Sequence, residues 1–282
     1  MKFFKIKSYA KINLSLNITG KLNSKLHKVE SIVSFVNLYD LIYLRPINSN
    51  NHRVYFKGKF AKGIKQNNSI SLLLKLLDKK NLLNNKRFEI KIVKNIPQQS
   101  GMGGGSMNAA SLIDFFLKKR FFKLSKKELI NLTYLLGSDV ILGIVRKNTV
   151  MSSNGKLRRF NKKIGFYVLI TKPNFGCSTK LIYSNVKNFS KSKYNNPSQK
   201  LLTKHSIVNS NNELEQISFK KYPKLKKIKL FLTQFPNIMF VRMSGSGSSI
   251  VAYFHSKKAV DLAAEKFKKK FKSYWCITSK TI

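Results

Sequence analysis

The sequence predicts an α+β fold with two lobes, divided near residue 160. An alternating, strand-like run at 88–94 leads into a glycine-rich loop and then into a helical pattern. Beyond residue 160 the pattern restarts with new strands and helices, and no internal repeat is visible. With 282 residues, 43% of them apolar, the chain can bury one large core or two modest ones. We therefore expect one domain at 1–160 and a second at 161–282.

Local patterns predict the elements of the first lobe in order. Strands are expected at 2–9, 12–19, 29–38 and 41–45, with a polar loop at Asn23, Ser24 and Lys25 after the second strand. Asn67 and Asn68 introduce a helix at 69–79. Ser106 is expected to cap the helix after the glycine loop, and Ser125 to cap a further helix that ends at Gly137.

The second lobe is predicted from its own strand and helix patterns. They indicate a strand at 166–171, a polar stretch at 185–200, helices at 213–219, 224–235 and 256–271, and strands at 238–243 and 250–254. A Ser-Gly-Ser-Gly-Ser turn joins the last two strands, and it is either a plain hairpin turn or a wall of small hydroxyl residues beside a phosphate.

The composition is strongly basic, with a formal net charge of +44. Such a charge favours binding to phosphate backbones, but only eight of the 55 basic residues are arginines and the lysines are spread along the whole chain. Lysine, Asn, Ile, Phe and Tyr all have A/T-rich codons, so base bias explains the composition without a selected nucleic-acid function. We expect no specific nucleic-acid partner, and a monomer or homodimer.

The chain carries no pattern of secretion, membrane insertion or metal binding by cysteine. Basic residues interrupt the N-terminal segment, and the longest apolar stretch, 135–145, contains Asp139 and is too short to span a bilayer. Cys177 and Cys276 are far apart and match neither a disulfide framework nor a zinc site. A cytoplasmic protein is expected.

The glycine-rich loop at 97–110 is the clearest candidate for a binding site. Glycines at 101 and 103–105 let the backbone approach a ligand, and the helix that follows would point unpaired amides at it, an arrangement that favours phosphate. The alternative is an ordinary glycine turn before a core helix. The loop matches neither a Walker A motif nor a dinucleotide fingerprint.

Two charged residues are candidates for chemistry. Asp139 stands at a break inside an apolar segment, where it is either a functional carboxylate or a helix cap or structural ion pair. Lys11 lies between two strand-like runs, with Asn13 on the same face by alternation, and it is otherwise a plain exposed lysine. Most of the other acidic residues are expected in solvated ion pairs among lysines.

Together these motifs resemble the GHMP kinase superfamily of small-molecule kinases. Three collinear blocks carry the resemblance over nearly the whole chain: Ala10-Lys-Ile-Asn-Leu14 with Gly20 and His27; Ile96-Pro97 through Ala110 with Leu136-Gly-Ser-Asp-Val140; and Arg242-Met-Ser-Gly-Ser-Gly247. They are most similar to the members that phosphorylate the 2-hydroxyl of a cytidine diphosphate-linked methylerythritol with Mg-ATP, a step of isoprenoid precursor biosynthesis. The resemblance implies an N-terminal lobe like ribosomal protein S5 and a C-terminal α/β sandwich.

The resemblance also implies roles for individual residues. Asp139 and Lys11 match the catalytic pair. The positions implied to hold ATP are Asn68, Lys94, Pro97, Gly101, Gly103, Gly104, Gly105, Ser106 and Asn108, with Ser106 also a candidate ligand of Mg²⁺. The positions implied on the substrate side are Asn13, His27, Tyr183, Gly245 and Ser246, with Tyr183 matching an aromatic residue that stacks on cytosine.

The chain departs from the family pattern before His27 and after Asp139. Ser24-Lys-Leu-His27 lacks a glycine and the second stacking aromatic, which leaves Leu26 to contact cytosine by apolar packing, and Ile141 stands where proline is usual. Two alternatives remain open: another GHMP kinase activity, such as on homoserine or mevalonate, or a basic RNA-binding protein derived from the fold. The intact Lys11, Asp139 and loop glycines favour an enzyme.

Overall fold

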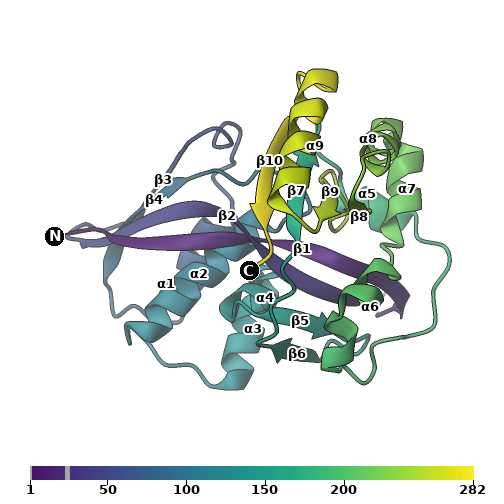
Figure 1. The fold of residues 1–282 in the computed structure, drawn as a ribbon. Coiled ribbons are helices and arrows are strands. Elements are labelled where there is room, and N and C mark those ends of the chain that lie inside the picture. The colour runs from purple at the N-terminus through teal and green to yellow at the C-terminus, as the bar shows by residue number, and fades with distance from the viewer. Residues whose placement is uncertain (1, 23–25) are drawn as a thin grey trace. The chain divides into compact units, whose positions relative to one another are not determined.

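The computed structural model describes residues 2–22 and 26–282 (Figure 1). The polar loop predicted at Asn23, Ser24 and Lys25 lies outside the described residues. The chain forms two compact units. The first unit comprises Met1–Lys11, Leu38–Gln98 and Gly103–Arg146, and the second comprises Ile12–Asn37, Gln99–Met102 and Lys147–Ile282.

Two long strands, β1 (Phe4–Lys21) and β2 (His27–Ile47), each contribute to both units. The sequence patterns predict breaks near residues 10 and 40, and this prediction is wrong because each strand is continuous. Residues 10–17 of β1 are all buried, whether apolar or polar. A strand covered on both faces loses the clean alternation by which strand ends are recognised.

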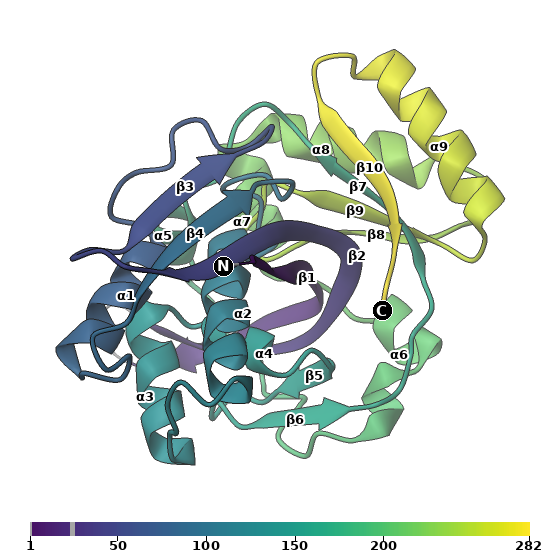
Figure 2. The ribbon, with the colours of Figure 1, turned by 90° about the vertical axis from the view of Figure 1, so that its left-hand side faces the viewer.

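In the first unit, helices pack on a small group of strands. Strand β4 (Arg87–Val93) pairs in parallel with β3 (Arg53–Lys57) and antiparallel with the Leu41–Ile47 part of β2. Helices α1 (Ser69–Lys79) and α2 (Gly104–Lys118) lie side by side (Figure 2). Their apolar faces share one core with β4, to which α3 (Lys126–Leu136) and α4 (Val140–Ile144) add residues.

Two helices of this unit have the limits that their caps predict. Asn68 and Ser71 form a capping box at the start of α1. Ser125 and Glu128 form another at the start of α3, and Gly137 ends that helix. The sequence patterns missed strand β3 and the short helix α4.

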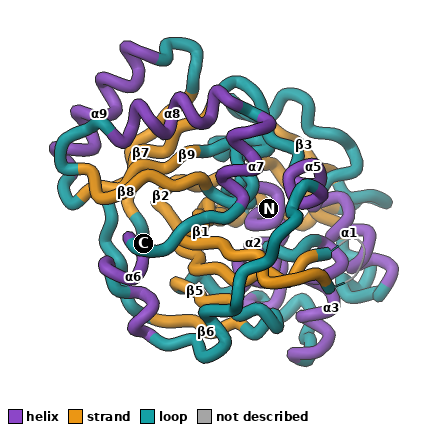
Figure 3. Tube along the Cα trace, turned by 90° about the vertical axis from the view of Figure 1, so that its right-hand side faces the viewer, coloured by secondary structure: helices purple, strands orange, loops and turns teal. Residues whose placement is uncertain are grey.

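In the second unit, strands β10 (Trp275–Lys280), β7 (Tyr167–Lys172), β9 (Ile250–Phe254) and β8 (Ile238–Met243) form an antiparallel sheet in that order. Helices α8 (Pro223–Thr233) and α9 (Lys257–Lys270) lie beside this sheet (Figure 3) and pack on it through one shared core. The ring centroids of Phe231 on α8 and Phe267 on α9 lie 6.4 Å apart. The predicted strands and helices are confirmed here, except that β10 was missed.

The second unit also contains several shorter elements. They are β5 (Asn148–Met151), β6 (Leu157–Phe160), α5 (Thr179–Ser184), a 3₁₀ helix (Gln199–Leu202), α6 (Lys204–Val208) and α7 (Leu214–Lys221). The last residues of the polar stretch 185–200 belong to the 3₁₀ helix, and α5 lies just before the stretch.

Candidate active site

The first unit brings Lys11 and Asp139 together. The Nζ atom of Lys11, on β1, lies 3.1 Å from Oδ2 of Asp139. The Lys11 side chain is 4% exposed, whereas that of Asp139 is 36% exposed. Asp139 stands at the N-cap position of α4 but makes no side-chain cap bond. The helix-cap alternative is therefore wrong, and the pair consists of a buried ammonium and a carboxylate that is open to a ligand.

The glycine loop starts α2 earlier than the sequence predicts. Gly103 is the N-cap, with a left-handed backbone (φ 68°), and no side chain caps the helix. The first helical bond runs from the amide of Met107 to the carbonyl of Gly103, at 2.8 Å. The prediction that Ser106 is the N-cap is wrong, because only glycine readily takes the positive φ that turns the chain at 103, and Ser106 becomes the third helical residue. The amides that precede Met107 suit an anion.

The same glycine places the start of α2 against the charged pair. A Cβ atom on Gly103 would lie 3.2 Å from Cγ and Cε of Lys11 and 3.6 Å from Oδ2 of Asp139. Cβ atoms on the next two glycines would instead contact residues outside the charged pair. At Gly104 the neighbours are Ile96 and Nζ of Lys94. At Gly105, Oγ of Ser69 would lie at 2.7 Å.

Asp40, which the sequence patterns missed, organises the residues behind this helix start. Its carboxylate is fully buried and accepts hydrogen bonds from the amides of Asn95 (2.7 Å) and Ile96 (2.8 Å). It also pairs with the Lys94 ammonium and accepts from Nδ2 of Asn108 at 3.0 Å. The expectation of a solvated surface pair is thus wrong for Asp40. An acid in the middle of the apolar strand β2 was the available signal.

Three residues predicted to bind ATP already have structural partners. Lys94 and Asn108 both bind Asp40, and Oδ1 of Asn108 is buried with no partner in the described part of the chain. The Asn68 side chain caps α1 by accepting from the amides of Ile70 and Ser71. Pro97 is buried after β4. ATP binding by these residues stays a prediction.

In the second unit, the Ser-Gly-Ser-Gly-Ser turn between β8 and β9 packs against the first part of the glycine loop. A Cβ on Gly101 would lie 2.0 Å from the Ser244 carbonyl oxygen, so only glycine fits there. The Ser244 hydroxyl donates to the Gly101 carbonyl at 2.9 Å, and the Ser249 amide donates to the Ser100 carbonyl at 3.2 Å. The turn is therefore more than a plain hairpin.

Three predicted substrate-side residues surround or form this turn. The backbone amide of Asn13 donates to the Ser244 hydroxyl at 3.2 Å. A Cβ on Gly245 would lie 3.5 Å from Oδ1 of Asn13. The hydroxyls of Ser246 and Thr179 are 2.8 Å apart, which links the turn to the start of α5. Asn13, Gly245 and Ser246 thus belong to one group.

The other two, His27 and Tyr183, contact each other elsewhere in this unit. Their ring centroids lie 5.4 Å apart. Burial, with a smaller contribution from the nearby charge of Lys21, lowers the pKa of His27 below 6.5. Leu26, at the position of the missing aromatic, is 41% exposed. Ser24, in the same departure from the family pattern, lies outside the described residues.

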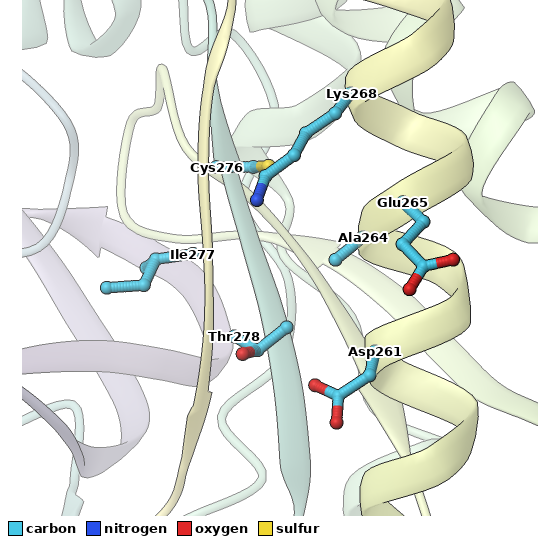
Figure 4. A pocket seen from close by; sticks show the side chains of 7 residues that line it. All are labelled: Asp261, Ala264, Glu265, Lys268, Cys276, Ile277 and Thr278. Atoms are coloured by element: carbon cyan, nitrogen blue, oxygen red, sulfur yellow. The ribbon is translucent and has the colours of Figure 1, made fainter.

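A surface pocket elsewhere in the second unit contains none of the predicted site residues (Figure 4). It lies between α9 and β10 and is lined by Asp261, Ala264, Glu265, Lys268, Cys276, Ile277 and Thr278. Among the described residues, no group of three His, Cys, Asp or Glu side chains is placed to hold a metal ion. Within the same described part of the chain, no helix is long and apolar enough to cross a membrane.

Comparison with known proteins decides the family. The model of the GHMP kinases N terminal domain matches residues 68–147, and that of the GHMP kinases C terminal domain matches 198–273. The 4-diphosphocytidyl-2-C-methyl-D-erythritol kinase of Pelagibacter ubique is 55% identical over 282 residues, the full length of both chains. The chain belongs to the GHMP kinases. The resemblance that the motifs predict is confirmed, and this GHMP kinase is an enzyme of the kinase class.

Further relatives agree with this assignment. The enzyme of the same name from Clostridium kluyveri is 31% identical, covering 95% of this kinase and 96% of the relative. A solved 4-(cytidine 5'-diphospho)-2C-methyl-D-erythritol kinase superposes with a TM-score of 0.79 at 21% identity, over 99% of this chain and 100% of the other. A homoserine kinase from Cytophaga hutchinsonii gives 0.67 at 16% identity, over 99% and 94%. These structures show the fold, and the two-domain α+β prediction is confirmed, while the boundary at residue 160 stays a prediction.

Proposed function

We propose that this GHMP kinase transfers the γ-phosphoryl group of ATP to the 2-hydroxyl of 4-diphosphocytidyl-2-C-methyl-D-erythritol, in isoprenoid precursor biosynthesis. One observation carries the reaction type: Gly103 places the uncapped start of α2 against the Lys11–Asp139 pair. A phosphate held by the helix amides would lie beside a carboxylate and an ammonium. The 55% identity to a full-length relative of that name carries the choice of substrate.

The charged pair suits activation of a hydroxyl group. The Asp139 side chain is 36% exposed, so its carboxylate can accept a hydrogen bond, and then the proton, from the substrate hydroxyl. Lys11 is held almost wholly inside the protein, 3.1 Å from that carboxylate. Its ammonium can stabilise the negative charge that develops on the attacking oxygen. Phosphoryl transfer mainly requires such positioning and charge neutralisation.

The phosphates of ATP would bind at the amides of Gly104, Gly105 and Ser106. No side chain caps the helix there, so these donors are open to an anion. The Ser106 hydroxyl and the Asp139 carboxylate are oxygen donors of the kind that Mg²⁺ prefers, and they are too few for a protein-only site. When bound with ATP, Mg²⁺ supplies charge neutralisation at the phosphates.

The acceptor would be bound by the second unit. His27 and Tyr183 offer an imidazole and an aromatic ring to a nucleobase. Asn13, Gly245 and Ser246 form the polar group beside the small-residue turn. The cytoplasmic location and the monomeric or homodimeric state expected from the sequence stay predictions.

The proposal is tested by incubating purified protein with Mg-ATP and, separately, the cytidyl substrate, homoserine and mevalonate. Product is identified by mass and by phosphorus NMR, and an Asp139→Asn variant serves as control. We expect one additional phosphate only on the cytidyl compound. Phosphorylation of homoserine or mevalonate instead would assign another GHMP activity. No product with any alcohol, together with salt-resistant binding to a defined RNA, would replace the enzyme by a nucleic-acid binder.

A further inference from the structure

A third aromatic ring lies beside His27, in a segment that the sequence patterns describe only as polar. The ring centroid of Phe189 is 6.2 Å from that of His27, with the planes tilted by 45°. Phe189 is 43% exposed, whereas the neighbouring Val186 is buried. Tyr183 and Phe189 therefore reach the same histidine from α5 and from the extended segment after it.

The segment that carries Phe189 is fixed on both sides. Before it, the Val186 amide donates to the Tyr183 carbonyl at 3.1 Å. After it, the Ser190 amide donates to the carbonyl of Ile18, on β1, at 2.9 Å. An exposed ring held between two such attachments loses little further freedom when it binds a ligand.

Glu30 strengthens the second attachment. This carboxylate is fully buried on β2 and accepts hydrogen bonds from the amides of Lys193 (2.8 Å) and Tyr194 (3.0 Å). It also accepts from the Ser192 hydroxyl (2.7 Å) and from Nδ2 of Asn17 (3.0 Å). The expectation of a solvated surface pair is wrong for Glu30 as well. Its buried carboxylate instead ties the segment after Phe189 to the two long strands.

His27 places its polar groups inside the aromatic cluster, not on its surface. Both ring nitrogens are buried and, within the described residues, neither has a hydrogen-bond partner. Burial lowers the pKa of His27 below 6.5, so at pH 7 the neutral ring offers one donor and one acceptor. The part of this cluster that a ligand can reach is therefore the exposed ring of Phe189.

We propose that Phe189 is a further substrate-binding residue that stacks on the pyrimidine ring of the substrate, a role that the sequence leaves to the exposed Leu26. This inference rests on the proposed function for the identity of the ligand. Stacking on an aromatic side chain does not depend on which base is bound, because every base has a π face. Phe189 thus contributes affinity for the base.

The first test measures the dissociation constants of CDP and UDP by calorimetry for wild type, Phe189→Leu and Phe189→Tyr. Loss of one base–aromatic stack corresponds to about 5- to 150-fold weaker binding, and we expect the leucine variant to lose affinity for both nucleotides by the same factor within this range. The tyrosine variant should stay within about twofold of wild type. Phe4→Leu is a matched control, since Phe4 is 38% exposed and belongs to the first unit. Binding of CDP by Phe189→Leu within twofold of wild type would overturn the proposal.

A second variant tests the contact directly, by a signal that does not require the affinity for the nucleotide to fall. The chain has one tryptophan, Trp275, so Trp275→Phe with Phe189→Trp leaves a single indole at position 189. We expect CDP to change the emission of that indole with the dissociation constant found by calorimetry. Unchanged emission at saturating CDP would contradict stacking.

The kinase assay separates this inference from the proposed function. If wild type phosphorylates the cytidyl compound and Phe189→Leu has the same KM, the inference fails and the function stands. If wild type binds CDP through Phe189 but phosphorylates nothing, the function fails and the base site stands. The KM for ATP should be the same in wild type and Phe189→Leu, and a parallel rise in both KM values would assign Phe189 a structural role only.

Discussion

Replacing Asp40 with asparagine should destabilise the first unit strongly and weaken ATP binding. The carboxylate is fully buried, and it pairs with Lys94 and accepts from the amides of Asn95 and Ile96 and from Asn108. Asparagine has nearly the same shape but leaves the Lys94 ammonium uncompensated and turns an amide donor toward another donor. Removing one partner of a buried pair costs about 3–5 kcal/mol.

That loss is a large part of a total stability of about 5–15 kcal/mol. The variant should therefore fold but unfold at a much lower urea concentration. Asn108 lies on α2, and releasing it should shift the helix start and raise the KM for ATP. Urea unfolding at pH 7 and steady-state kinetics measure the two effects.

Two further variants make the Asp40 test specific. Asp114→Asn breaks the surface pair with Lys118, whose side chain is 72% exposed, and should cost less than about 1 kcal/mol. Lys94→Met in the Asp40→Asn background removes the uncompensated ammonium and should recover part of the loss. A cost below about 1 kcal/mol for Asp40→Asn, or no recovery in the double variant, would refute the role given to the buried pair.

Three other predictions concern the charged pair, the glycine turn and the pH dependence of stability. Asp139→Asn should lower kcat roughly 100- to 10,000-fold without changing the melting temperature much, and near wild-type turnover in a coupled ADP assay would exclude it as the base. Gly103→Ala should lower kcat at least tenfold because its Cβ would press on Lys11. Gly63 has a similar positive φ but no atom within 4 Å of an added Cβ, so Gly63→Ala should show only the loss of stability that comes from backbone strain. Equal kinetics in both variants would contradict this. Burial lowers the pKa of His52 below its unfolded value of 6.5, so the free energy of unfolding should fall as the pH drops below about 6.5 and level off below the folded pKa. His52→Gln should flatten that slope in urea titrations at pH 5.5–7.5, and an unchanged slope would show that other groups cause it.

Elements that are set by local chemistry could be predicted from the sequence to the residue. The helix at 69–79 begins after Asn68 and the helix at 126–136 ends at Gly137, because caps depend on groups within a few residues. The start of α2 was misplaced, although serine is a good cap. The positive φ of Gly103 is set by the packing of the whole loop, so it cannot be predicted from the preference for serine at helix caps.

The pairing of Lys11 with Asp139 could be predicted, whereas the buried acids Asp40 and Glu30 could not. Asp139 stands out because it interrupts an apolar segment, whereas Lys11 is one lysine among many and is singled out by the family motif. Asp40 and Glu30 were taken for surface acids because nothing near them in the sequence shows that the amides of 95–96 and 193–194 approach them. An acid inside an apolar strand, as at Asp40, signals burial, but the partners of a buried carboxylate are distant in sequence and are visible only in the fold.

The glycines of the loop have different structural roles, which the sequence motif alone does not distinguish. The sequence assigns Gly101, Gly103, Gly104 and Gly105 one role, which is to leave room for phosphate. In the structure, a side chain at Gly101 would strike the backbone of Ser244, one at Gly105 would strike Ser69, and one at Gly103 would press on Lys11. Each glycine thus permits a different close approach, and the amides at the start of α2 have no capping side chain. Substitutions along the loop should therefore separate into losses of stability at 101 and 105 and a loss of turnover at 103.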